Sequence, residues 1–398
     1  MIDVFDIPDL VPRLVDRSLV VYEEATGRYS LLETVRQYAA EHSLNHEDSA
    51  GLRDRHLSYY KEFTRDCRRK LRGADQVRWL AQFDEEYDDI RLALDWSLSS
   101  ELRCKDGVIL AYQIRDYWEI RSRFEESLAW IARMQPWAAS LDIAGRCRIL
   151  LIQSLIRYYT SQANAEQALD ALQLARETGD PVLIGQALVI GILDSLQVGR
   201  IADARALKDE VFETLAIVDD QVMIAFAHMN FGNTALAEGD LDEAESHYEE
   251  CLKIREQTKD FRGIGSALCS LGYINQYRGN VELAIQQFRK GVPMMAAVGT
   301  GWGVAGALPC FCLELTLAGR FEDAARVLGY SEAGVKRVGG KRDRVDGPNY
   351  EHWMNVVSQT LGKDKFDALF QAGTLMSPKA VKLLLFPDGL PATDREYL

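Results

Sequence analysis

Long apolar runs are missing from this sequence. Nowhere in its 398 residues do about 18 consecutive apolar residues occur, which is the length that a helix needs to cross the hydrocarbon core of a bilayer. The first six residues, Met-Ile-Asp-Val-Phe-Asp, also lack the basic stretch and apolar core of a signal peptide. We therefore expect no membrane segment and a protein that works in the cytoplasm.

Cysteine and histidine are few and scattered. The seven cysteines are odd in number, and the closest pair, Cys310 and Cys312, would face different directions on a helix. None of the six histidines has zinc-like spacing to a cysteine or glutamate on a shared face. His42 and His46 are four apart, but a predicted helix ends there. We expect buried, reduced thiols and no metal site.

The sequence also lacks an excess of basic residues. It contains 46 Lys and Arg residues and 60 Asp and Glu residues. The resulting formal net charge of −14 argues against broad binding to a nucleic-acid backbone. The densest basic run lies between Arg65 and Arg72, and no aromatic platform for stacking bases is interleaved with it. We interpret this run as a surface or interdomain contact, with nucleic-acid binding as the less favoured alternative.

Motifs for catalysis and cofactor binding are missing as well. No Gly-x-x-x-x-Gly-Lys-Ser/Thr loop occurs, so we expect no ATP binding by that route. The carboxylates between Asp84 and Asp89 fit a solvated helix face better than acid–base chemistry. We therefore expect no catalytic residue, no cofactor and no enzymatic activity; an enzyme would need a polar constellation that we do not find.

What the sequence does contain is an internal repeat. Four segments align at a spacing of 40 residues and share Gly, a polar residue, an apolar residue, two mostly polar residues and Ala. Two weaker copies lie upstream, at Ser122–Ser127 and Ala163–Ala168. The four strong copies begin and end at Gly199 and Ala204, Gly239 and Ala244, Gly279 and Ala284, and Gly319 and Ala324.

Each repeated position has a physical role. The Gly ends one helix and permits a left-handed C-terminal cap, and the small Ala five residues later lets the next helix approach closely. Gly232 and Gly272 lie seven residues before two of these turns and would let the paired helices cross tightly. The pattern therefore predicts stacked pairs of helices.

This pattern resembles the tetratricopeptide repeat, strongly over about 185–330 and more weakly over about 105–184. The resemblance implies an all-α fold, a tetratricopeptide-like α-solenoid. A spacing of 40 rather than the usual 34 residues implies helices longer by about one turn or longer loops between repeats. We expect the repeats to span 101–330, after a helical connector at 46–100 and before a C-terminal helical cap at 331–398.

The first 45 residues follow a different pattern. Apolar residues at helical spacing between Leu10 and Leu19 predict a helix, and two short strands around a turn at 23–27 predict a β-hairpin. A second helix is expected at about 33–42. Together they predict a partial winged helix over 1–45, whose first helix would carry Arg13 and Arg17 if it read DNA.

A second resemblance then becomes specific. Leu14-Val-Asp-Arg-Ser-Leu-Val20 and Tyr29-Ser-Leu-Leu-Glu-Thr-Val-Arg-Gln-Tyr-Ala39 resemble the winged-helix segment of bacterial STAND regulatory ATPases, and the likeness continues through Arg55-His-Leu-Ser-Tyr-Tyr60 and Asp88-Asp-Ile-Arg-Leu-Ala-Leu94. In that family this segment joins a nucleotide-binding module to C-terminal tetratricopeptide repeats. The resemblance implies either a natural short relative without that module or the C-terminal piece of a larger protein.

These expectations define a function. We expect a non-catalytic scaffold for protein–protein interaction or ligand sensing in a bacterial signalling or transcriptional system. A protein or peptide is the expected partner, and a small-molecule effector is a second candidate. Nucleic acid is not expected to bind this chain alone; the alternative is a DNA-binding transcriptional regulator that acts through the winged helix.

The binding surface is expected on the concave face, where the first helix of each pair lies. Tyr273 and Tyr277 are four apart, so they share a helical face and are expected to be exposed together. Tyrosine offers a large contact area and a hydrogen-bonding tip. The full set of concave-face candidates is Met229, Asn233, Leu236, Tyr273, Gln276 and Tyr277.

Overall fold

The computed structural model describes residues 7–24, 27–43, 49–160, 162–342, 344 and 346–389. The chain separates into two compact units, Met1–Ser58 and Tyr59–Leu398. The described residues are helical apart from one two-stranded hairpin, which confirms the predicted all-α fold. The four-part division made from the sequence stays a prediction. His46 and the side chain of His42 lie outside the described residues.

The first unit holds the predicted hairpin between two helices. Its strands are antiparallel, with Val20 opposite Leu31 and Tyr22 opposite Tyr29. The hairpin is confirmed, while the winged helix remains a prediction. The elements are α1 (Ile7–Asp16), β1 (Val20–Glu23), β2 (Arg28–Leu31) and α2 (Glu33–Ser43), and α3 (Ser49–Phe63) runs across the boundary between the units.

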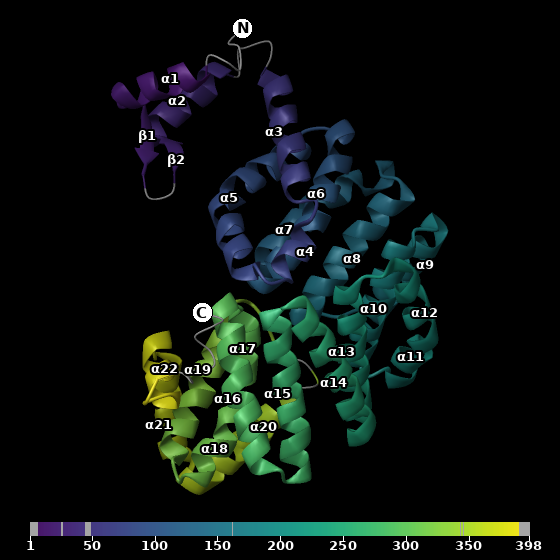
Figure 1. Ribbon diagram of the computed structural model, residues 1–398, viewed down its shortest axis with the longest axis vertical. Coiled ribbons are helices and arrows are strands. Elements are labelled where there is room, and N and C mark those ends of the chain that lie inside the picture. The colour runs from purple at the N-terminus through teal and green to yellow at the C-terminus, as the bar shows by residue number, and fades with distance from the viewer. Residues whose placement is uncertain are drawn as a thin grey trace. The chain divides into compact units, whose positions relative to one another are not determined.

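The second unit is a stack of helices in chain order (Figure 1). Its first part comprises α4 (Cys67–Leu71), α5 (Gln76–Ser97), α6 (Glu101–Ile120), α7 (Phe124–Met134), a 3₁₀ turn (Gln135–Ser140), α8 (Ile143–Tyr159), α9 (Ala165–Thr178), α10 (Pro181–Gln197), α11 (Ile201–Ala206) and α12 (Lys208–Val218). The two most regular pairs follow: α13 (Gln221–Glu238) with α14 (Leu241–Thr258), and α15 (Phe261–Arg278) with α16 (Val281–Val298).

The repeated glycines form the turns between paired helices. Gly239 and Gly279 have φ of +83° and +80°, a left-handed conformation in which only glycine avoids a steric cost. In the first of these turns the Gly239 amide donates to Leu236 O and the Asp240 amide donates to Ala235 O. These bonds satisfy carbonyls that the end of α13 would leave unpaired. The Asp240 side chain then caps α14 by accepting from the Glu243 amide at 3.0 Å.

Close crossing within each pair depends on glycine in the first helix. A Cβ added to Gly272 would lie 2.4 Å from Phe288 Cε1, and one added to Gly232 would lie 2.4 Å from Tyr248 Cε1. The aromatic ring of the second helix therefore packs directly on the backbone of the first helix. The four small alanines that follow the turns, Ala204, Ala244, Ala284 and Ala324, are fully buried.

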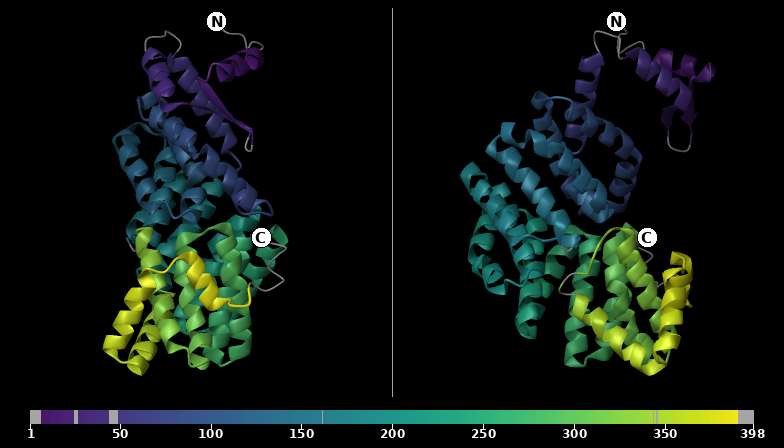
Figure 2. Two further views of the ribbon diagram at one scale, coloured as in Figure 1. Left: turned by 90° about the vertical axis from the view of Figure 1, so that its left-hand side faces the viewer. Right: turned by 180° about the vertical axis from the view of Figure 1, so that it is seen from behind.

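The stack curves until its early helices meet later ones. Arg121, just after α6, donates to Val298 O at the end of α16 at 2.8 Å. Ser122 Oγ accepts from the Trp302 amide at 3.0 Å, and Tyr159 O accepts from the Lys341 amide at 2.9 Å. In the three views of Figures 1 and 2, blue helices from the early part of the second unit lie next to green helices from its later part. These contacts turn the second unit into a nearly closed stack with a defined inner face.

The C-terminal helices pack on α19 through another close crossing. A Cβ on Gly329 of α19 would lie 2.0 Å from Phe370 O, and one on Gly373 of α21 would lie 2.1 Å from Arg326 O. The buried cluster around Phe311, Leu328 and Trp353 fills the space behind them. This region comprises α17 (Gly301–Ala307), a 3₁₀ turn (Leu308–Cys310), α18 (Phe311–Leu317), α19 (Phe321–Arg337), α20 (Asp346–Leu361), α21 (Lys363–Thr374) and α22 (Pro378–Leu385).

Two predictions from the sequence, on membrane segments and on cysteines, can be compared with the structure. Across the helices that the structure describes, none is long and apolar enough to pass through a bilayer. All seven cysteines are buried and free.

The crossing at Gly272 gives a stability prediction. Gly272→Ala should destabilise the protein by about 1–3 kcal/mol, because the Phe288 ring must move from a tightly packed site. Gly347→Ala is the matched control, because a Cβ there meets no atom within 4 Å. Urea unfolding compares the two variants, and equal stability for both would contradict the crossing geometry.

The first 45 residues should not fold in isolation. Among the side chains described between Asp9 and Glu41, Val20 is the one buried hydrophobic, while Tyr22, Tyr29, Leu31 and Tyr38 are exposed. So small an apolar interior does not offset the conformational entropy lost on folding. We expect the isolated 1–45 peptide to melt without a cooperative transition in circular dichroism, and a sigmoidal transition would refute this expectation.

Candidate functional site

A cavity of about 190 Å³ lies on the inner face of the second unit. Its wall is built from α4, α6, α8, α10, α13, α14, α15, α16 and α17. These elements are far apart in the sequence and meet only because the stack curves. The cavity therefore belongs to the fold as a whole and not to any single repeat.

One side of the cavity is apolar and adaptable. Three methionines line it, and methionine fills irregular space because its side chain is flexible and polarisable. Phe226 adds an aromatic surface whose ring lies 4.6 Å from the guanidinium carbon of Arg72 and 4.5 Å from that of Arg255. The apolar lining is Val189, Ile190, Leu193, Met223, Phe226, Met229 and Met295.

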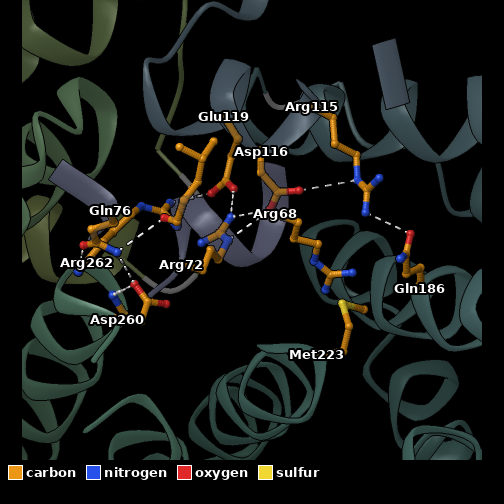
Figure 3. A network of polar contacts seen from close by, with 12 residues as sticks. Arg68, Arg72, Gln76, Arg115, Asp116, Glu119, Gln186, Met223, Asp260 and Arg262 are labelled. Carbon is orange, nitrogen blue, oxygen red and sulfur yellow. Dashed lines mark hydrogen bonds and ion pairs between the residues drawn. The ribbon is translucent and has the colours of Figure 1, made fainter. Parts of the chain in front are cut away.

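The other side is a buried network of charges (Figure 3). Arg72, the residue that follows α4, donates to Asp116 Oδ1 at 3.0 Å through Nε and also bonds Glu119 Oε2, both on α6. Glu119 Oε1 accepts from Arg262 of α15 and, at 2.6 Å, from the Tyr159 hydroxyl. Arg72 is 2% exposed and Glu119 is 4% exposed. The network thus fastens an early helix to a helix of the regular repeats.

A second branch of the network runs through Asp260, at the start of α15. Its Oδ1 accepts from Gln76 Nε2 and from the Gly263 amide, both at 3.0 Å, while its Oδ2 pairs with Arg255. Asp260 is fully buried, so these bonds replace the hydrogen bonds that water would otherwise donate to its carboxylate. Gln76 and Asp260 are 184 residues apart, and their contact closes the stack.

The ion pairs set the protonation of the buried carboxyls. Burial acts to raise the pKa of Asp116, but Arg72, Arg115 and Arg68 outweigh it and hold that pKa well below its ordinary value. In the same way, burial is outweighed at Glu119 by Arg262 and Arg72, and at Asp260 by Arg255 and Arg72, so both of these pKa values are lowered. The three groups are therefore carboxylates at neutral pH.

Two asparagines on α13 line the cavity, and each is held by a hydrogen bond at one end of its side-chain amide. Asn230 Nδ2 donates to Val189 O at 3.3 Å, which turns its carbonyl oxygen the other way. Asn233 Oδ1 accepts from the Tyr248 hydroxyl at 2.8 Å, which turns its amide nitrogen away from Tyr248. Both residues line the cavity. One acceptor and one donor on the same helical face match the two polar groups of a peptide unit.

The residues predicted for the concave face divide into two groups. Met229, Asn233 and Tyr273 line the cavity, whereas Leu236, Gln276 and Tyr277 are not part of its lining. Gln276 instead donates to Asn349 of α20 at 3.2 Å. Whether these residues bind a partner stays a prediction.

The expectation that Tyr273 and Tyr277 are exposed together is wrong. Tyr277 is 49% exposed, but Tyr273 is only 5% exposed. The ring of Tyr273 packs against Phe288 of α16, with centroids 5.2 Å apart. Tyr273 lies nearer the middle of the pair, where the partner helix covers it.

The basic run between Arg65 and Arg72 has a role that sequence reasoning missed. Arg65 is exposed, Arg68 lines the cavity, and Arg72 is buried in the network. Arg68 lies on α4, and Arg72 directly follows the end of that helix. No local signal shows that these side chains meet carboxylates about 45 residues and more away.

Metal binding has no support among the residues that the structure describes, where no group of three or more His, Cys, Asp or Glu side chains is arranged to hold an ion. The polar groups of the cavity are mainly arginine–carboxylate pairs. Such an arrangement recognises and orients charged or peptide-like groups.

Comparison with known proteins supports the fold. A model of the tetratricopeptide repeat matches residues 223–297, which cover α13, α14, α15 and nearly all of α16. The crystal structure of a Rap protein complexed with competence and sporulation factor is similar at a TM-score of 0.50 and 15% identity, over 80% of this chain and 99% of that one. The second unit is thus a helical-repeat scaffold of tetratricopeptide type.

Curated relatives come from mycobacteria. Proteins of Mycobacterium tuberculosis and Mycobacterium bovis that are provisionally named HTH-type transcriptional regulators are 28% identical over 304 residues, which is 73% of this chain. The chain spans about a third of their length, 34%. A STAND protein with a tetratricopeptide-repeat sensor from Pyrococcus horikoshii aligns with 97% of this chain and 56% of its own, at 14% identity and a TM-score of 0.49.

The buried carboxylates make stability depend on pH. Their pKa values are lowered in the folded state from ordinary values of 3.8 for Asp and 4.5 for Glu, so their contribution is present above those values and is lost as the pH falls through the folded pKa. We expect the urea midpoint to fall steeply from about pH 5 to pH 3.

Glu119→Gln tests the origin of this dependence. The variant should be less stable at pH 7 by about 3–5 kcal/mol, because it removes a charge from a buried pair, and its stability should fall less steeply in acid. Glu249→Gln, at an exposed position of α14, is the control. If Glu119→Gln kept the acid slope of the unsubstituted protein, the network would not be its source.

Proposed function

We propose that this protein is the non-catalytic binding arm of a bacterial regulatory system, and that it captures a peptide or an extended segment of a protein partner in the cavity of the second unit. The observation that carries this proposal is the cavity itself. It combines an adaptable apolar wall with the paired donor and acceptor of Asn233 and Asn230. Apolar clefts with a few convergent polar groups are typical ligand sites.

A binding role fits the chemistry of the cavity better than a catalytic one. Glu119 and Asp260 are each held by several donors. Carboxylates with lowered pKa values that are engaged in this way are poor general bases at neutral pH. The same bonds hold the cavity wall in place before a ligand arrives, and this reduces the entropy lost on binding.

The comparisons supply the biological setting of the proposal. The curated relatives carry names of transcriptional regulators, and the Rap protein with a similar fold was crystallised with competence and sporulation factor. We transfer to this chain only the role of a sensor for a peptide or protein. Met229, Asn233 and Tyr273 would contact the ligand in the cavity, while Leu236, Gln276 and Tyr277 would extend the contact along the inner face.

DNA binding through the first unit is the second candidate, and the names of the curated relatives favour it. In the first unit, Arg13 on α1 and Arg17 directly after it are exposed, but Asp9 and Asp16 of α1 are exposed too. A mixed helix of this kind attracts a phosphate backbone less than a basic one. Fluorescence anisotropy with labelled duplex DNA at low salt separates this candidate from the peptide-binding proposal.

The peptide-binding proposal is tested by closing the cavity. Ser266 lines it and is only half-buried, so Ser266→Trp should fill the space without disturbing the outer packing. Peptides selected from a random octapeptide library with the full chain should bind this variant at least tenfold more weakly, since each factor of ten corresponds to about 1.4 kcal/mol of lost contact.

The control is Glu256→Trp, an equally large change at an exposed position of α14. It should leave peptide affinity unchanged, and both variants should keep the helical circular dichroism of the unsubstituted chain. Equal affinity for Ser266→Trp and the unsubstituted protein would show that the cavity is not the binding site.

A further inference from the structure

The cavity has an uneven charge balance that the proposed function does not explain. Five arginines line it: Arg68, Arg72, Arg115, Arg255 and Arg262. The carboxylates paired with them are Asp116, Glu119, Asp220 and Asp260. One positive charge is therefore in excess at this site, although the chain as a whole carries a formal net charge of −14.

The carboxylates on the α15 side are fully engaged. Glu119 accepts from Arg72, Arg262 and Tyr159, and Asp260 accepts from Arg255, Gln76 and the Gly263 amide. Arg255 and Arg262 are thus matched by the carboxylates beside them. The excess charge lies at the other end of the cavity, where Arg68 of α4 and the following Arg72 meet Arg115 of α6; we call these three residues the arginine end.

Hydrogen bonds at the arginine end leave donors available. Arg115 donates to two neutral acceptors, Tyr112 O at 2.7 Å and Gln186 Oε1 at 2.9 Å, and its Nε lies 3.9 Å from Asp116 Oδ2. Arg68 has a carboxylate neighbour in Asp220, at 3.3 Å. Within the described residues, Arg72 Nη1 is buried and has no hydrogen-bond partner, and the same holds for Asp116 Oδ2.

A buried donor without a partner is costly, and a cationic donor more so. The side chain of Arg72 is 1% exposed, so bulk water does not satisfy this nitrogen. The side chain of Arg68 is 16% exposed, and burial lowers its pKa. Two desolvated guanidiniums beside a third form a site that matches an oxyanion, because their planar N–H groups bind carboxylate and phosphate in pairs.

We propose that the arginine end of the cavity binds an anionic group of the ligand, a carboxylate or a phosphate, while the methionine-lined wall receives its apolar part. This inference rests on the proposed function and narrows it to ligands of an acidic, amphipathic kind. The anion would lie between Arg68, Arg72 and Arg115 and would balance the excess charge. Figure 3 shows these three side chains on the two neighbouring helices, with Asp116 among them.

Simple anions test the site without knowledge of the ligand. Inorganic phosphate and acetate should each raise the thermal midpoint of the full chain above that in sodium chloride of equal ionic strength, because a ligand that binds only the folded state stabilises it. Arg68→Gln and Arg115→Gln should each abolish the shift. Arg65→Gln removes the same charge from an exposed position three residues before Arg68 and should keep it.

Asp116→Asn tests the charge balance in the opposite direction. It removes a carboxylate from the arginine end while keeping the size of the side chain, so the shift caused by phosphate should increase. Using two arginine variants guards against misfolding of one, and circular dichroism identifies the folded variants. No shift with either anion, or an equal shift in folded Arg68→Gln or Arg115→Gln, would overturn the proposal.

Peptides separate this inference from the proposed function. Peptides selected with the full chain are synthesised with their carboxylates free, converted to amides, or replaced by a phosphoserine. We expect at least tenfold tighter binding of the anionic forms, a ratio that falls to about one in Arg68→Gln and Arg115→Gln. The phosphoserine form distinguishes a phosphate from a carboxylate preference.

The possible outcomes point to different conclusions. Equal binding of acid and amide forms that is lost in Ser266→Trp would refute the anion site and leave the peptide-binding proposal standing. A phosphate shift that depends on Arg68 and Arg115, without any peptide binding, would support the anion site and refute the peptide-binding proposal.

Discussion

Arg72 joins parts of the chain that the repeats alone would not bring together. It directly follows the short helix α4 and pairs with Asp116 and Glu119 of α6, and Glu119 in turn binds Arg262 of α15. Burying these charges costs desolvation free energy that only good geometry offsets. The hydrogen bonds between this network and α15 form only when the stack is closed. The network therefore makes one curvature of the stack more stable than the others. The position of the cavity follows from that curvature.

Within this network, different side chains contribute to stability and to the proposed recognition of a ligand. The engaged carboxylates, Glu119 and Asp260, hold the helices together. The guanidiniums at the arginine end have hydrogen-bonding capacity left over. A ligand that satisfied this capacity would add to contacts already in place and would require little rearrangement of the wall. Its binding would therefore be felt at α15, through Glu119 and Arg262, as well as at α4.

The fold could be predicted from the sequence to the extent that it depends on short-range rules. The Gly and Ala that recur every 40 residues indicate a helix end, a turn and a close crossing, all of which are set within one pair of helices. The hairpin at Val20–Leu31 was equally visible because alternation and turn residues are local. The cavity was not predictable in this way. Arg72 and Glu119 are 47 residues apart, and Gln76 and Asp260 are 184 apart, so their meeting depends on small angles summed over many helices. Tyr273 shows the same limit, since its burial depends on Phe288 of the neighbouring helix and not on its own helical position.

The contacts that close the stack change how such a protein unfolds. In an open solenoid each repeat contacts only its neighbours. Its stability is then approximately the sum of the repeats and of the interfaces between neighbouring repeats, and the two ends fray independently. Here the Tyr159–Lys341 and Gln76–Asp260 bonds link positions 182 and 184 residues apart. Loss of the helices from α5 to α8 would release α15 and the loop after α19 together, and that joint release makes the scaffold a single cooperative unit. Its folding, in turn, waits on long-range loop closure, which is slow compared with the formation of any one helical pair.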